Sequence, residues 1–285
     1  MSLKSVVPIR YCCRYFGVSR SSYYYWKKDK EFVSVKNKSE VVSAIKKSFD
    51  LSKGTYGSPR VYKDMVEQKL KVSENTVAKY MCEMGLNARL KKKYRVMTTD
   101  SNHDEPIAPR LFKTDEDDHL PTNPSEILAG DITYLRLGAR HIYLAVVMDL
   151  YNREIVGWSL SDSLDTQIIL DSLQMAMDKA GPDAEVIFHS DRGSQYASEA
   201  YRKMLKAHHA KPSMSRKGNC YDNAYVESWF GSFKKEWLYR HDYSTKEELR
   251  QIVFEYIEIW YNRKRKHSAL DYKSPIEYKL INQAA

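Results

Sequence analysis

The sequence lacks any apolar run long enough to cross a membrane. None of its hydrophobic stretches approaches a length of about 18 residues, and the N-terminus has no signal-peptide hydrophobic region. The four cysteines (Cys12, Cys13, Cys82 and Cys220) form no CxxC pair and no recognisable disulfide framework, which suits a reducing compartment. We therefore expect a cytoplasmic protein with no membrane partner and no structural zinc.

Acidic residues are the minority among the charged ones. The 46 Lys and Arg against 37 Asp and Glu give a net charge of +9 at pH 7, and the pI is about 9.1. Such a balance favours a polyanionic partner such as nucleic acid, although many basic proteins share it. With 285 residues, the chain can bury a large core and can form two domains.

The stretch 185–238 carries the clearest pattern. The run 185–188 consists of Glu185 followed by β-branched and aromatic residues and lies between flanking glycines, which predicts a buried strand and puts Asp191 on the turn after it. Residues 221–238 have helical periodicity, with Asp222 or Asn223 as the N-cap. The apolar stripe of this helix consists of Val226, Phe230, Phe233 and Trp237. Glu227 and Lys234 are seven residues apart and therefore share a face beside it.

A third acid, Asp131, lies inside another predicted strand. Runs at 126–135, 141–150 and 154–161 predict an antiparallel meander, followed by a helix at 164–180. After the strand at 185–188 come a helix at 197–208, a strand at 212–215 and the helix at 221–238. This order is that of a ribonuclease-H-like α/β fold. A charge inside a strand is costly unless it is paired or binds a metal, so three acids on separate elements favour a two-metal phosphoryl-transfer site.

These motifs resemble a known superfamily. The sequence GDITYL at 130–135, HSDRGSQY at 189–196, and a glutamate with 35 residues between it and Asp191 resemble the DDE signature of retroviral integrases. Two flanking stretches, SRKGNCYDNAYVESWFGSFKKEW and WYNRKRKHSALDYKSPIEY, resemble the OrfB-type transposases of the insertion-sequence-3 family. The resemblance covers nearly the whole chain. Many family members have a tryptophan where this chain has Leu128. Because leucine is a smaller apolar residue that can still fill a strand position, the difference concerns the packing of the strand and not the chemistry of the site.

The resemblance implies an activity and a set of partners. Asp131, Asp191 and Glu227 would be catalytic and would hold two Mg²⁺ ions, with Mn²⁺ expected to substitute. The enzyme would cleave transposon ends and join the freed 3′-OH to target DNA. Lys234 corresponds to a basic residue that contacts the transposon end. The implied partners are double-stranded DNA (terminal inverted repeats and target), further copies of the chain in a homo-oligomer on DNA, and the upstream insertion-sequence product. The implied location is the bacterial cytoplasm, at the nucleoid.

Two questions stay open at the site. The alternative function is a DNA-end-binding regulator of transposition that does not cut; an intact acid triad favours the enzyme. Three further residues are predicted to support the metal ligands: Asp149, which ends the second strand and could instead be structural, His189 as a hydrogen-bonding neighbour, and Asn223 at the start of the helix.

The N-terminal third predicts small helical units. Residues 1–30 suggest a helix-turn-helix with Ser19 as a cap, or a simple bundle helix. Residues 39–95 predict a DNA-binding helix-turn-helix-like domain with caps at Ser39, Ser58 and Ser73 and a C-cap at Gly85. Its DNA-contact candidates are Arg60, Lys79, Arg89, Lys91, Lys92, Lys93 and Arg95. The run from Arg89 to Arg95 is either a phosphate-binding arm or a solvated face.

The remaining boundaries follow composition. Residues 96–124, with prolines and an acidic run, predict a linker without a core of its own. Residues 125–240 form the predicted catalytic core. Residues 241–285 predict a basic amphipathic helix capped by Ser244, followed by a tail, and Arg263 and Arg265 are its DNA-contact candidates.

Overall fold

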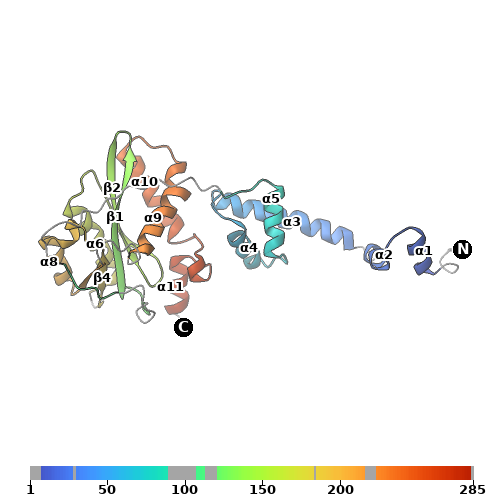
Figure 1. The fold of residues 1–285 in the computed structure, drawn as a ribbon, viewed down its shortest axis with the longest axis horizontal. Helices are drawn as coiled ribbons and strands as arrows, with labels where there is room; N and C mark the ends of the chain where they lie inside the picture. Colours follow the sequence, from blue (N-terminus) through green and yellow to red (C-terminus); the bar gives the residue numbers. More distant parts are fainter. Residues whose placement is uncertain are drawn as a thin grey trace. The chain divides into compact units, whose positions relative to one another are not determined.

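The structure is a computed structural model that describes residues 8–27, 30–88, 107–112, 121–182, 184–215 and 223–283, with residues 25–27 and 30–37 described by their backbone alone. Contacts divide the chain into two compact units, Met1–Arg89 and Leu90–Ala285. Within the described part, no helix is both long and apolar enough to span a membrane. Figure 1 shows the elements of each unit.

The first unit is helical. Its elements are α1 (Ile9–Tyr15), α2 (Arg20–Lys27), α3 (Lys30–Leu51), α4 (Ser58–Glu67) and α5 (Glu74–Glu83). Three helix ends match the prediction: Ser19 Oγ accepts from the Ser22 N–H at 3.0 Å, Ser73 Oγ accepts from the Thr76 N–H at 3.2 Å, and Gly85 has φ +66° after α5.

Two predicted caps of this unit are wrong. Ser39 lies inside α3, which already begins at Lys30, because the segment 30–38 contains neither glycine nor proline to stop the helix. The N-cap of α4 is Gly57, and Ser58 is the first helical residue, ahead of Pro59.

The core of the first unit is built from i, i+4 pairs on three helices. Each pair is buried: Val41 and Ile45 on α3, Val61 and Met65 on α4, Val77 and Met81 on α5. Ser48 Oγ donates to Asp64 Oδ2 at 2.5 Å and thereby ties α3 to α4.

The second unit contains a five-stranded sheet in the order β3-β2-β1-β4-β5. The strands are β1 (Ile127–Leu137), β2 (Arg140–Asp149), β3 (Ile155–Ser161), β4 (Ile187–Ser190) and β5 (Lys211–Met214). The first three form the predicted antiparallel meander, and β4 and β5 are added in parallel to β1. The strand predicted at 185–188 begins two residues later, because Ile187 is the first residue to pair with β1.

The helices of this unit lie on both faces of the sheet, with α6 and α8 on one and α9 and α10 on the other (Figure 1). They are α6 (Thr166–Ala180), α7 (Ser194–Ala197), α8 (Glu199–Ala207), α9 (Ala224–Glu236), α10 (Lys246–Phe254) and α11 (Pro275–Gln283). Single turns of 3₁₀ helix lie at Leu238–Arg240 and Ser268–Leu270. The cap of α10 is Thr245, in a capping box with Glu248, and not the predicted Ser244. The helix continues as a π-helix over Glu255–Tyr261.

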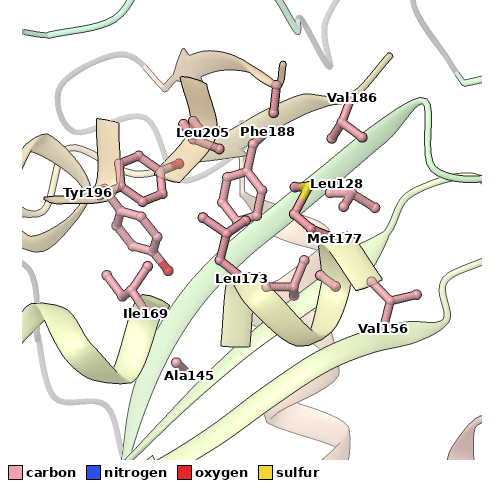
Figure 2. Close-up of a cluster of buried hydrophobic side chains, with 14 of the residues drawn as sticks. Leu128, Ala145, Val156, Ile169, Leu173, Met177, Val186, Phe188, Tyr196 and Leu205 are labelled. Atoms are coloured by element: carbon pink, nitrogen blue, oxygen red, sulfur yellow. The ribbon is translucent and has the colours of Figure 1, made fainter. Parts of the chain in front are cut away.

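A hydrophobic cluster fills the space between the sheet and α6, α7 and α8 (Figure 2). Leu128 from β1, Phe188 from β4 and Leu173 from α6 are fully buried there, so Leu128 is packed in the core. Gly157 permits the closest approach, because a Cβ at this position would come 2.0 Å from the Ser172 carbonyl oxygen of α6.

The edge strand β3 is covered by one side chain from the C-terminal region. Asn262 Nδ2 donates to the Ile155 carbonyl at 2.9 Å, and its Oδ1 accepts from the Ile155 N–H at 3.0 Å. The Asn262 amide thus bonds the backbone N–H and C=O of Ile155, the groups that a neighbouring strand would otherwise pair with at this edge.

Candidate active site

Asp131 lies in the middle of β1, where it pairs with Val146 of β2. Alternation along the strand turns Leu128 and Gly130 toward the hydrophobic cluster and Asp131 toward α9. One carboxylate oxygen, Oδ1, accepts from the Ile132 N–H at 2.8 Å. Burial raises the pKa of Asp131 well above its usual value, and Asp191 and Glu227 raise it further. The other two predicted catalytic acids, Asp191 and Glu227, therefore lie near enough to Asp131 to affect its ionisation.

Asp191 follows β4 directly, on the predicted turn. The parallel pairing of β1 and β4 ends with Ala129 opposite His189, so continuing each chain by two residues brings Asp131 and Asp191 to the same level. Adjacent strands are about 4.8 Å apart, which makes the two acids close neighbours at one end of β4. Asp191 Oδ1 accepts from the Gly193 N–H at 2.9 Å, which fixes this carboxylate on its turn.

Glu227 comes from the first turn of α9, where its N–H donates to the Asn223 carbonyl at 3.2 Å. The predicted apolar stripe of this helix, Val226, Phe230, Phe233 and Trp237, is buried throughout. The Glu227 side chain is exposed beside that stripe. Across the described ranges, no three Asp, Glu, His or Cys side chains are close enough as they stand to hold a metal ion. Asp191 and Glu227 thus interact electrostatically with Asp131, but the three side chains as positioned are not close enough to bind one metal ion together.

Lys234 lies two helical turns after Glu227, also facing β1. Its ammonium donates to Thr133 Oγ1 at 2.8 Å and lies 5.0 Å from the centroid of the Tyr134 ring. Burial lowers the pKa of Lys234 to about 8, while the nearby Asp131 opposes that shift. Lys234, the predicted DNA contact, therefore already donates a hydrogen bond within the protein, near Asp131.

The three residues predicted to support the ligands differ in position. Asp149 is fully buried and accepts from the Ser125 N–H at 2.8 Å and the Tyr151 N–H at 3.0 Å. It pairs with Leu128, three residues before Asp131 along β1. At about 3.4 Å per residue this is some 10 Å from Asp131 along the strand, and the two backbone contacts of Asp149 favour the structural alternative for this residue.

His189 and Asn223 are both buried. His189 Nδ1 is 2.9 Å from Ser213 Oγ, and that oxygen also accepts from the Leu111 N–H at 3.0 Å. His189 thus helps to anchor the extended segment 107–112 to the sheet. Asn223, one of the two predicted candidates, is the N-cap of α9, but its side chain makes no capping hydrogen bond.

The predicted DNA contacts on the described elements fall into two groups. Lys79 and Arg263 are exposed, and Arg60 is half-buried with its guanidinium 5.5 Å from the centroid of the Tyr56 ring. Arg265 is wrong as a DNA contact: it is 4% exposed, and its Nε and Nη2 donate to the Glu236 carboxylate at 2.6 and 2.7 Å. The remaining candidates, Arg89, Lys91, Lys92, Lys93 and Arg95, lie outside the described residues.

The sequence did not point to two aromatic residues, Phe188 and Tyr196, that pack against β1 on the face opposite Asp131. A Cβ on Gly130 would come 3.2 Å from the Tyr196 hydroxyl and 2.7 Å from the Phe188 ring, so glycine here lets both rings approach β1. Burial raises the pKa of Tyr196 well above its usual value, and Asp131 and Asp191 add to this. Tyr196 therefore lies close to both aspartates. The motif HSDRGSQY contains it, but only the aspartate of that motif suggested chemistry.

Comparisons with known proteins agree with this architecture. Integrase core domain profiles match residues 121–220 and 208–275, and an HTH-like domain profile matches residues 36–94. The insertion element IS600 uncharacterized 31 kDa protein of Shigella sonnei is 36% identical over 94% of this chain and 97% of its own. Transposase InsF for insertion sequence IS3A of Escherichia coli (strain K12) is 37% identical over 97% of this chain and 95% of its own.

Among solved structures, the simian T-cell lymphotropic virus intasome in complex with PP2A regulatory subunit B56 gamma overlaps with a TM-score of 0.47 at 15% identity, over 79% of this chain and 70% of that one. An HTH-like domain followed by an integrase core with ribonuclease-H-like topology defines a transposase of the DDE nucleotidyl-transferase class. The chain belongs to the IS3 family of insertion-sequence transposases.

Proposed function

We propose that this transposase cleaves transposon ends and joins the freed 3′-OH to target DNA, with Asp131, Asp191 and Glu227 as its catalytic residues. The observation that carries the proposal is the convergence of three acids from β1, the end of β4 and the start of α9. Burial raises the pKa of Asp131 most, and Asp191 and Glu227 both raise it further, which supports placing the three acids near one another. A carboxylate whose pKa is raised by burial and by two further acids is a candidate for a functional group.

The residues fit a pair of Mg²⁺ ions, with Mn²⁺ as a substitute. Carboxylate oxygens are the donors that Mg²⁺ prefers, and a cation among three acids would relieve their repulsion. When bound, the ions would supply charge neutralisation at the phosphate that is attacked. The protein's own contribution is positioning: Asp191 is fixed by the Gly193 N–H, and Asp131 lies within a paired strand.

DNA is the partner that the HTH-like domain and the family imply, and we propose the terminal inverted repeats and target DNA as the specific sequences. Residues 1–30 and 39–95 would bind the ends through Arg60, Lys79 and the run from Arg89 to Arg95. Residues 96–124 would link them to the core at 125–240, and residues 241–285 would add Arg263. Several copies of the chain, and the upstream insertion-sequence product, would assemble on the two ends.

The test is cleavage and strand transfer on a labelled terminal-repeat duplex with Mg²⁺. Asp131→Asn, Asp191→Asn and Glu227→Gln should each lower the rate at least about 10³-fold while end binding persists. The matched control is Asp171→Asn, which changes an exposed acid on α6 that accepts from Gln167. Mg²⁺-dependent strand transfer by the Glu227→Gln variant would refute the proposal. If the wild-type chain binds ends but never cuts them, a DNA-end-binding regulator is the better account of its function.

A further inference from the structure

Two pairs of residues connect β1 with α9. Asp131 and Thr133 are two positions apart on the strand and so share its α9-facing side. Glu227 and Lys234 are seven positions apart on the helix, which is two turns of about 3.6 residues, and so share its β1-facing side. The first pair, Asp131 and Glu227, consists of two like charges, and Glu227 contributes to the raised pKa of Asp131. The second pair, Thr133 and Lys234, is joined by a hydrogen bond of 2.8 Å.

The hydrogen bond between Thr133 and Lys234 is well placed to hold α9 at a fixed distance from β1. Thr133 is 8% exposed and Lys234 is half-buried, so water competes little for this hydrogen bond. The bond is charge-assisted, and such bonds are about twice as strong as neutral ones. The Tyr134 ring, 5.0 Å from the ammonium, adds a second attraction on the same strand. An attractive contact therefore lies next to a repulsive one, between the same two elements.

We propose that Thr133 and Lys234 are positioning residues whose hydrogen bond holds α9 against β1, so that Glu227 stays close enough to Asp131 for one divalent cation to bind both. The inference rests on the proposed function, because it assumes that these two acids bind metal. It assigns Thr133 a role in the reaction and gives Lys234 a task before DNA arrives, in addition to any DNA contact.

The test compares Thr133→Val, which keeps the shape but removes the acceptor oxygen, with Thr133→Ser, which keeps the oxygen. Mn²⁺ affinity of the full chain is measured by titration calorimetry without DNA. Thr133→Val should raise the Mn²⁺ dissociation constant about 10-fold or more, the effect typical of lost contacts around a metal site. Thr133→Ser should stay within about 3-fold of wild type. If Thr133→Val does not fold, Thr133→Ala is measured in the same way.

A second measurement separates this role from others. Terminal-repeat affinity without metal should be equal in wild type and Thr133→Val, because Lys234 and its charge remain. Unchanged Mn²⁺ affinity in Thr133→Val, with or without a loss of end affinity, overturns the inference and leaves the proposed function intact. Absence of Mn²⁺ binding and of strand transfer in the wild type overturns the proposed function itself, and this inference with it.

Discussion

At the scale of single residues, two aspartates of the sheet show how surroundings decide the effect of a charge. Asp149 is fully buried but accepts two backbone hydrogen bonds, and burial raises its pKa to about 6. Asp131 accepts one hydrogen bond, from its own neighbour, and two further acids add to the effect of burial in raising its pKa well above the usual value. The same change, aspartate to asparagine, should therefore have opposite effects at the two positions.

Asp131→Asn should stabilise the metal-free protein at pH 7.5. A folded-state pKa above the unfolded value means that the folded state binds the proton more tightly, so stability falls as pH rises through that pKa. Removing the charge abolishes this loss, and a gain of ~1 kcal/mol would raise Tm by about 2–4 °C. Thermal melts at pH 5.5 and 7.5 measure this. A lower Tm for Asp131→Asn at pH 7.5 would contradict the description of three repelling acids.

Asp149→Asn should destabilise the protein. The Ser125 and Tyr151 N–H groups donate to different oxygens of Asp149, and an amide can accept only one of these bonds. A buried donor left without its acceptor costs about 1–3 kcal/mol, and the amide NH₂ that replaces one carboxylate oxygen would face the backbone N–H that this oxygen had bound. Urea unfolding measures the difference. A stability equal to that of wild type would show that these turns tolerate the amide.

At the scale of elements, the periodicity of α9 was sufficient to predict its buried stripe, because helical spacing determines which side chains share a face. The apolar run before Asp191, bounded by glycines, was likewise sufficient to place that residue on a turn. Neither pattern revealed the Thr133–Lys234 or Glu236–Arg265 contacts, whose partners are 101 and 29 residues apart. No local pattern records which distant element a side chain will meet. Arg265 was therefore grouped with Arg263 in one basic run, although their environments are opposite.

Arg265→Met should destabilise the second unit by about 3–5 kcal/mol, because it leaves the Glu236 charge buried without its partner. Arg263→Met is the matched control, since Arg263 is exposed and should cost less than about 0.5 kcal/mol. Combining Arg265→Met with Glu236→Met should restore most of the loss. Chemical denaturation gives all three values, and an equal effect of the two single changes would refute the buried pair.

At the scale of the whole molecule, the order of strands and helices predicted the ribonuclease-H-like core, because the three antiparallel strands and the later parallel ones differ in how they are connected. Element ends were less predictable. The long helix after Thr245 changes to π-helix at Glu255, and α3 begins before Ser39. For α3, the absence of glycine and proline from residues 30–38 outweighs the capping preference of Ser39.

DNA binding by the whole chain should depend steeply on salt. Each phosphate contact contributes about 0.9 to the slope of log affinity against log salt, so changing Lys91, Lys92 and Lys93 to Gln should reduce the slope by up to about 2.7. The matched control changes Lys203, Lys206 and Lys211, which are exposed on or near α8. Titrations of a terminal-repeat duplex at several salt concentrations measure both slopes. An unchanged slope in the first variant would make that run a solvated face.

The most direct test of the central claim is to locate Mn²⁺ by anomalous scattering in crystals of the protein. We expect density within about 2.0–2.4 Å of carboxylate oxygens of Asp131 and Asp191, with Glu227 drawn toward the ion, and its loss in Asp131→Asn. Mn²⁺ bound elsewhere, or bound equally in wild type and Asp131→Asn, would contradict the assignment of these acids as the catalytic centre.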